Sequence, residues 1–230
     1  MKSLATGSSA FTTFLQVWPR LFSLVGKMRP TWRVRSLAEV TPAYLSARDV
    51  RGLIWDVDGT LTGDGRTDLV HERAGPFQAL LADGDVRHVI LSNASEERFR
   101  QLGGMFPEIP LLRGYRHGSA TVFRRLHGGV DSVTADQLAT RLADGAYVLR
   151  KPNADLTGYA VRELGCGKEH VAMVGDQYLT DVAGANLGGI RSIKLPTLAP
   201  ETFRRTVRVG QIVETVLYAL VYGWRDRGHT

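Results

Sequence analysis

Cysteine is nearly absent from this 230-residue sequence, because Cys166 is the single one. One cysteine excludes an intrachain disulfide framework and any cysteine-rich zinc site, and it favours a reducing, cytoplasmic compartment. No apolar run reaches the roughly 20 residues that a transmembrane helix needs, so we do not expect the chain to span a bilayer as a helix. A recognised motif for binding nucleic acid is missing, as is a stretch of interleaved aromatic residues, so nucleic acid is not the expected partner.

Acidic residues are scarce relative to basic ones. The chain has 29 Lys plus Arg against 23 Asp plus Glu, a formal net charge of +6. This balance favours anionic partners such as phospholipid surfaces or phosphorylated substrates. With 43% hydrophobic residues, the chain is long enough for one sizeable α/β core with appended segments.

The first segment, residues 1–36, contains no acidic residue, and its large apolar side chains recur at helical spacing with an interruption at Pro19. These apolar residues are Phe11, Phe14, Leu15, Trp18, Leu21, Phe22 and Val25. Such side chains are expected to be buried against another surface. The alternatives are the rest of the domain, a second copy of the chain and an anionic membrane surface. A cleaved targeting peptide is a further alternative. Residues 201–230 have a similar character and predict an amphipathic helix over 202–222.

Between these segments, residues 37–200 alternate short apolar runs with helical patterns. The runs at 53–55, 86–91, 147–149, 170–174 and 190–195 predict strands. Helices are expected at 69–82, with Gly75-Pro76 as a break or the true start, at 95–104, at 118–127, at 134–143 and at 153–164. The alternation predicts an α/β fold built on a doubly wound, Rossmann-like parallel sheet.

Polar residues suited to chemistry follow these strands. Asp56 and Asp58 follow the first, Ser92 the second, Lys151 the third, and Asp176 with Asp181 the fourth. Parallel strands of such a sheet end at one edge, so we expect these groups to converge there. Paired carboxylates at a glycine turn suit a hard cation and phosphate chemistry.

Four stretches together resemble the haloacid dehalogenase (HAD) superfamily of phosphohydrolases that use an aspartate nucleophile. They are DVDGT at 56–60, ILSN at 90–93, RKPN at 150–153 and VGDQYLTD at 174–181. The text VTPAYL at 40–45 and the sequence GDQYLTDVAGAN further resemble the YqeG-type, phosphatidylglycerophosphatase-like branch.

The resemblance implies a role for each of these residues. Asp56 would be the nucleophile and Asp58 the general acid and base, with Lys151 neutralising the phosphate. Ser92 and Asn93 would bind phosphoryl oxygens, and Thr60 and Asp181 would support the site. Mg²⁺ would be held by Asp56, Asp176 and the backbone carbonyl of Asp58. The implied reaction is hydrolysis of a phosphomonoester.

The substrate is left open by the sequence. The basic, apolar ends favour a phosphatidylglycerophosphate-like lipid and peripheral membrane binding, whereas a soluble sugar or nucleotide phosphate is the main alternative. A phosphate-binding scaffold without turnover is the other alternative. Residues 111–146 would form either a small lid or an extension of the sheet edge. Its arginines, Arg113, Arg116, Arg124, Arg125 and Arg141, would be either a solvated basic face or ligands for a second anionic group.

Overall fold

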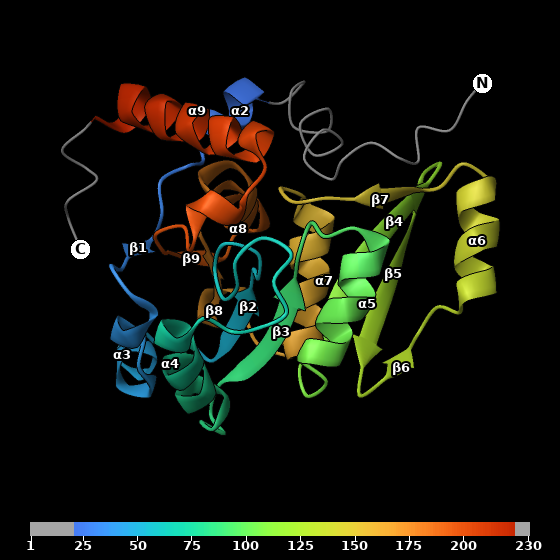
Figure 1. Ribbon diagram of the computed structural model, residues 1–230, viewed down its shortest axis with the longest axis horizontal. Coiled ribbons are helices and arrows are strands. Elements are labelled where there is room, and N and C mark those ends of the chain that lie inside the picture. The colour runs from blue at the N-terminus through green and yellow to red at the C-terminus, as the bar shows by residue number, and fades with distance from the viewer. Residues whose placement is uncertain (1–20, 224–230) are drawn as a thin grey trace.

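The computed structural model describes residues 21–223, and Figure 1 shows their arrangement. The predicted apolar pattern from Phe11 to Trp18 and the break at Pro19 lie outside the described residues. Within the described part, a central sheet carries helices on both faces, as the alternation of apolar runs and helical patterns predicts. The protein therefore has an α/β, mainly parallel, Rossmann-like fold.

The sheet has nine strands among the described residues, in the order β1-β9-β8-β2-β3-β4-β5-β6, with β7 paired to β4. The strands from β1 to β4 in this order run parallel, whereas β5, β6 and β7 are antiparallel to their neighbours. Their bounds are β1 Trp32–Arg33, β2 Gly52–Trp55, β3 Arg87–Leu91, β4 Leu111–His117, β5 Ala120–His127, β6 Val130–Asp131, β7 Tyr147–Leu149, β8 Val171–Gly175 and β9 Arg191–Lys194.

The helices that pack on the sheet begin and end largely where the sequence signals predict. The longer ones are α4 His71–Leu81, α5 Glu96–Met105, α6 Ala135–Ala143, α7 Ala154–Leu164 and α9 Arg205–Tyr222. Short ones are α2 Leu21–Val25, η3 Leu37–Glu39, α3 Pro42–Ser46, η4 Lys168–His170, the π-helical turn η5 Tyr178–Val182, α8 Ala183–Gly188 and η6 Pro200–Thr202. Ser95, Thr134 and Asn153 cap the N-termini of α5, α6 and α7 with their side chains.

Two sequence predictions about elements are wrong. The helix predicted over 118–127 is the strand β5, which forms a hairpin with β4, so residues 111–131 extend the sheet edge. The predicted break at Gly75-Pro76 is absent, since α4 continues through Pro76. The missing N–H of Pro76 costs α4 one backbone hydrogen bond, while burial of Phe77 and Leu80 holds the helix on the sheet.

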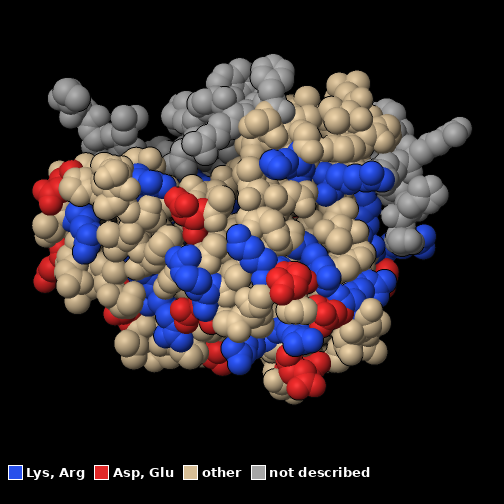
Figure 2. Space-filling view, turned by 180° about the vertical axis from the view of Figure 1, so that it is seen from behind, with Lys and Arg blue, Asp and Glu red and all other residues tan. Residues whose placement is uncertain are grey.

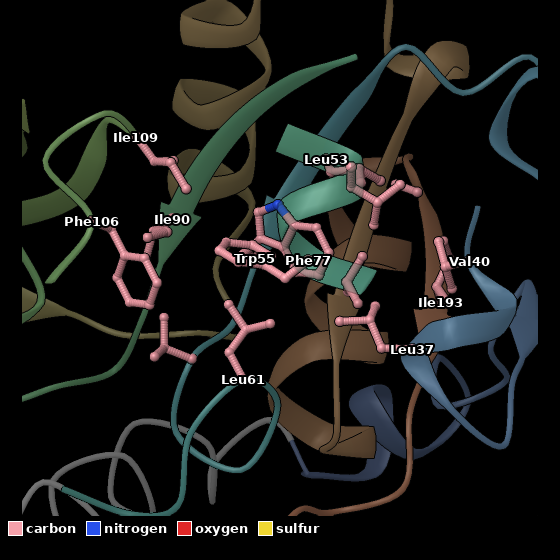
Figure 3. Close-up of a cluster of buried hydrophobic side chains, with 14 of the residues drawn as sticks. Leu37, Val40, Leu53, Trp55, Leu61, Phe77, Ile90, Phe106, Ile109 and Ile193 are labelled. Carbon is pink, nitrogen blue, oxygen red and sulfur yellow. The ribbon is translucent and has the colours of Figure 1, made fainter. Parts of the chain in front are cut away.

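Alternate side chains of the strands enter different cores. Leu53 and Trp55 of β2 pack with α4 and α5 on one face, whereas Ile54 packs with α7 on the other. Figure 3 shows Trp55 at the centre of the first core, with its ring edge-on to Phe77 at a centroid distance of 5.0 Å. These two cores fix the strand ends that carry the polar residues.

A third, smaller core joins both ends of the described chain. Leu24 of α2 and Met28 pack with Tyr178 of η5 and Tyr218 of α9. Figure 1 shows α2 and α9 side by side at one end of the molecule. The described terminal segments thus dock on the domain, next to the turn that follows β8. No helix in residues 21–223 is long and apolar enough to cross a membrane.

Candidate active site

The loop after β2 forms a tight turn whose shape depends on glycine. Three N–H groups, those of Thr60, Leu61 and Thr62, bond to the carbonyl of Val57. Gly59 has φ +91°, a backbone conformation that residues with a Cβ rarely adopt. An added Cβ at Gly59 would lie 2.8 Å from Asp176 Oδ2. Gly59 therefore lets the loop after β2 lie directly against Asp176 in the loop after β8.

Lys151 joins two of the predicted carboxylates. Its Nζ lies 2.6 Å from Asp56 Oδ1 and 2.7 Å from Asp181 Oδ1, and all three side chains are buried. The hydroxyl of Thr60 lies 3.4 Å from Asp56 Oδ2 and 3.5 Å from Asp176 Oδ1. The residues that follow β2, β7 and β8 thus lie together, as the sequence predicts. The predicted reason holds for β2 and β8, which are parallel, but not for β7, which runs antiparallel to β4.

Three buried carboxylates form a cluster that suits a metal ion. Asp56, Asp176 and Asp181 each offer an oxygen, and these oxygens lie within 4.8 Å of one another. Lys151 balances one of the three negative charges through direct contact. A divalent cation fits this surplus of buried negative charge and an all-oxygen donor set.

Burial and crowding change the proton affinities of these groups. Burial raises the pKa of Asp56 well above its usual value, and the nearby Asp181 and Asp176 add to the rise, although Lys151 opposes it. Burial and the charge of Asp181 raise the pKa of Asp176 to about 6. Burial would lower the pKa of Lys151, but Asp181 and Asp56 outweigh it and raise that pKa above its usual value.

Asp58 lies apart from the carboxylate cluster. Its Oδ1 accepts from Arg98 Nη2 at 2.7 Å and from Arg98 Nε at 3.2 Å, and Oδ2 lies 3.4 Å from the same Nε. Arg98 is buried on α5. The backbone of Asp58 is in the turn beside Asp56, so its predicted contact with a metal through the carbonyl stays a prediction.

Ser92 and Asn93 follow β3 at the same edge of the sheet. The side chain of Asn93 bonds to the backbone of Lys151 in both directions, donating to its carbonyl at 3.0 Å and accepting from its N–H at 2.7 Å. Asn93 therefore holds the loop of Lys151 in place. The binding of phosphate by Ser92 and Asn93 stays a prediction.

Neither alternative for the arginines of residues 111–146 describes the two most buried ones. Arg113 donates to the carbonyls of Ala94 and Ser95 and to Glu96, and it is 3% exposed. Arg124 is 1% exposed and pairs with Glu96 and Asp131. Arg113 thus holds the loop after β3, and both arginines hold Glu96 at the start of α5, so they are neither a solvated face nor free for a substrate.

The C-terminal helix also contacts the site, which the sequence does not predict. Gln211 Nε2 lies 3.3 Å from Asp176 Oδ2. Glu214 Oε2 accepts from the backbone N–H groups of Tyr178 and Leu179, at 3.0 and 3.4 Å. Burial raises the pKa of Glu214 to about 8. Gln211 and Glu214, which lie among the apolar residues of α9, are the only sequence signal for these contacts.

Comparison with known proteins gives consistent similarities. A family model described as HAD-hydrolase-like matches residues 148–197, the part that contains Lys151, Asp176 and Asp181. The chain is 27% identical over 196 residues to "Probable phosphatase YqeG" of Bacillus subtilis (strain 168), covering 85% of this chain and 91% of that protein.

Two solved structures are also similar, each at 17% sequence identity. An uncharacterized protein from Listeria monocytogenes serotype 4b has a TM-score of 0.41, over 66% of this chain and 88% of that chain. The 4-nitrophenylphosphatase from Thermotoga maritima has a TM-score of 0.40, over 67% and 89% respectively.

Proposed function

Given that this chain is a member of the haloacid dehalogenase (HAD) superfamily of phosphatases, we propose that it is a magnesium-dependent phosphomonoester hydrolase acting through a phosphorylated Asp56. The observation that carries the proposal is the contact of Lys151 with both Asp56 and Asp181, beside Asp176. A nucleophilic carboxylate needs a cation nearby to approach an anionic phosphate, and this arrangement supplies one.

In the first half-reaction, an oxygen of Asp56 attacks phosphorus, and the bond between phosphorus and the ester oxygen breaks. Asp58 gives a proton to the departing oxygen, so an alcohol leaves and Asp56 carries the phosphoryl group. In the second half-reaction, Asp58 takes a proton from water, whose oxygen attacks phosphorus. The bond to Asp56 breaks, and inorganic phosphate leaves.

The other residues of the site orient these groups. Lys151 neutralises charge on the phosphoryl oxygens. Asp181 holds Lys151 through Oδ1, and Asp181 is itself fixed because its Oδ2 accepts from the N–H of Gln177 at 3.0 Å. Asp56 and Asp176, with the carbonyl of Asp58, would hold Mg²⁺. When bound, Mg²⁺ offsets the repulsion between the nucleophilic carboxylate and the phosphate. Ser92 and Asn93 would bind phosphoryl oxygens, and Thr60 would support the two carboxylates.

Phosphate release from p-nitrophenyl phosphate with Mg²⁺ or with EDTA tests this proposal. We expect turnover with Mg²⁺, loss of turnover with EDTA, and a loss of at least about 10³-fold in Asp56→Asn, because a nucleophile has no substitute. Asp68→Asn changes an exposed aspartate of the same loop and should retain activity. Turnover that persists in EDTA or in Asp56→Asn would refute the mechanism.

The substrate that we propose is a lipid phosphate, similar to phosphatidylglycerophosphate, presented at a membrane surface. The outward face of α9 supports it, because large apolar side chains there are exposed, with Leu220 at 75% and Ile212 at 63%. The others are Val209, Val213, Val216 and Val221. In Figure 2 the upper right of the molecule, where α9 lies, is mostly tan, with Lys and Arg side chains below it.

Charge and position agree with a membrane as the partner of this face. Arg204, Arg205 and Arg208 are exposed at the N-terminal end of α9, where they would meet anionic headgroups. The opposite side of α9 contacts Asp176 through Gln211. A surface bound to α9 would therefore lie at the same end of the molecule as the catalytic residues.

Sedimentation with vesicles of phosphatidylcholine, with and without phosphatidylglycerol, tests membrane binding. We expect binding to the anionic vesicles and a loss of about tenfold or more in Ile212→Ser/Leu220→Ser, since each side chain contributes roughly 1.5–3 kcal/mol when buried. Val130→Ser is the matched control, because Val130 is 71% exposed on β6, away from α9. Equal sedimentation of both variants, or dimers on gel filtration that Ile212→Ser/Leu220→Ser dissociates, would contradict the membrane assignment.

A further inference from the structure

Arg98 holds the side chain of Asp58 with two nitrogens on one edge of its guanidinium. Nη2 and Nε both bond to Asp58 Oδ1, at 2.7 and 3.2 Å, and Nε also reaches Oδ2 at 3.4 Å. The Arg98 side chain is 9% exposed and that of Asp58 is 18% exposed. A pair so shielded from water, with more than one hydrogen bond, fixes orientation far better than a surface ion pair does.

The chain builds this contact from two loops of the catalytic edge. Ser95 caps α5 by accepting from the N–H of Arg98, which puts Arg98 in the first turn of the helix that follows β3. Asp58 lies in the turn that follows the neighbouring strand, β2. The contact therefore joins the ends of two adjacent parallel strands.

The remaining donors of Arg98 hold the guanidinium itself in place. Nη1 donates to Gln101 Oε1 at 2.5 Å, and Nη2 also lies 3.3 Å from Thr62 Oγ1. Each of its three nitrogens thus has a partner within the protein. This arrangement suits a residue that acts on Asp58 and leaves little capacity for binding substrate directly.

We propose that Arg98 is the positioning residue for Asp58 and sets the orientation from which Asp58 transfers its proton. The proposal rests on the proposed function, in which Asp58 protonates the departing ester oxygen as the Asp56–phosphorus bond forms. Proton transfer needs the donor and acceptor oxygens within about 2.6–3.2 Å. A short carboxylate that turns freely meets that condition rarely, and small errors of position cost large factors in rate.

Two esters with different leaving groups separate this role from a structural one. p-Nitrophenolate leaves without a proton, whereas the alkoxide of n-butyl phosphate needs one. Asp58→Asn should slow n-butyl phosphate by about 10²–10⁴-fold in kcat, the usual contribution of a general acid. Its effect on the first step with p-nitrophenyl phosphate should be much smaller, measured as the burst of p-nitrophenolate.

Arg98→Met keeps an unbranched stem that reaches about as far as Nε and removes the guanidinium. We expect it to lower kcat for n-butyl phosphate by about 10–100-fold, which does not exceed what a general acid contributes. The rate of the p-nitrophenolate burst should fall by less than about threefold, because that leaving group needs no proton. In the Asp58→Asn background it should cause no further loss, because it acts through Asp58. Arg98→Lys should be intermediate, since lysine cannot form the forked contact.

The control is Arg100→Met, because Arg100 is 60% exposed on the same helix and should leave both rates unchanged. Thermal unfolding checks that each variant is folded. If Arg98→Met does not fold, Arg98→Lys takes its place in the comparison. If Asp58→Asn slows both esters equally, the assignment of Asp58 as the acid fails. If Asp58→Asn discriminates but the Arg98 variants slow both esters equally, or slow Asp58→Asn further, the positioning role alone is overturned.

Discussion

At the residue scale, Gly59 is the position where the catalytic turn tolerates least change. Its φ of +91° disfavours any side chain, and an added Cβ would lie 2.8 Å from Asp176 Oδ2 and 2.9 Å from Phe203 Cζ. We predict that Gly59→Ala lowers the free energy of unfolding by about 1–2 kcal/mol from backbone strain. It should also weaken Mg²⁺ activation, because Asp176 is displaced. Urea unfolding and the Mg²⁺ dependence of kcat measure both effects.

Gly65 is the matched control for this prediction. It also has a positive φ, +68°, but an added Cβ there would meet nothing within 4 Å. Gly65→Ala should therefore cost stability while leaving the Mg²⁺ dependence unchanged. If both variants change the Mg²⁺ dependence equally, the close approach of Gly59 to Asp176 is not what matters.

Individual site residues could be predicted where a strand delivers them. Asp56 and Asp176 follow apolar runs that form the parallel strands β2 and β8, whose ends meet at one edge, so the convergence of these two follows from pattern alone. Lys151 follows β7, which runs antiparallel to β4, so its arrival at the same place does not follow from that rule. Arg98 could not be predicted, because nothing in the sequence separates it from the nearby exposed Arg100. Only the packing of α5 against the turn after β2 distinguishes them.

At the element scale, α9 packs on η5, the turn that carries Asp181, and holds it by hydrogen bonds. Glu214 accepts the N–H groups of Tyr178 and Leu179, which begin that turn. Glu214→Ala would leave both donors buried without this acceptor, and we predict a loss of about 1–3 kcal/mol in the free energy of unfolding. Glu214→Gln keeps an acceptor oxygen and resembles the protonated form that a pKa of about 8 favours at neutral pH, so it should cost less. Urea unfolding at pH 7 compares them, and an equal loss in both would exclude the hydrogen bonds as the cause.

The hairpin β4–β5 shows what local pattern leaves out. Residues 118–127 contain enough basic and apolar side chains to suggest a helix, yet they form a strand because β4 offers a long pairing edge and Arg124 finds Glu96 and Asp131. Glu96 is 28 residues from Arg124 in the sequence, so the local pattern of the hairpin does not reveal it. Tertiary pairing therefore overrides local preference here. Helices with capping residues, such as α6 and α7, could be predicted because their signals are local.

At the scale of the whole molecule, His88 makes stability depend on pH. Trp55 Nε1 donates to His88 Nδ1 at 3.1 Å, and His88 Nε2 lies 3.1 Å from the carbonyl of Leu80, which suits a neutral ring. Burial lowers the pKa of His88 to about 4 from an ordinary value of 6.5. Between those values the unfolded chain takes up a proton that the folded protein does not, so stability falls as pH drops through this window.

We predict that the wild type loses about 3 kcal/mol more than His88→Gln in its free energy of unfolding between pH 7 and pH 4, at about 1.36 kcal/mol per pKa unit. Glutamine can still accept from Trp55 but does not titrate, and all other titrating groups are shared. Urea unfolding across this range measures the difference. Parallel curves for the two proteins would show that His88 is not the source of the pH dependence.

The central claim is that Asp56 becomes phosphorylated during turnover, and trapping that phosphoryl group tests it most directly. Asp58→Asn should still form the intermediate from p-nitrophenyl phosphate, but it should hydrolyse it slowly because the base is missing. After acid quenching, mass spectrometry of the peptide containing Asp56 should show one added phosphoryl group, removable by hydroxylamine and absent from Asp56→Asn/Asp58→Asn. Release of p-nitrophenolate with phosphate on another residue, or its persistence without Asp56, would contradict the account.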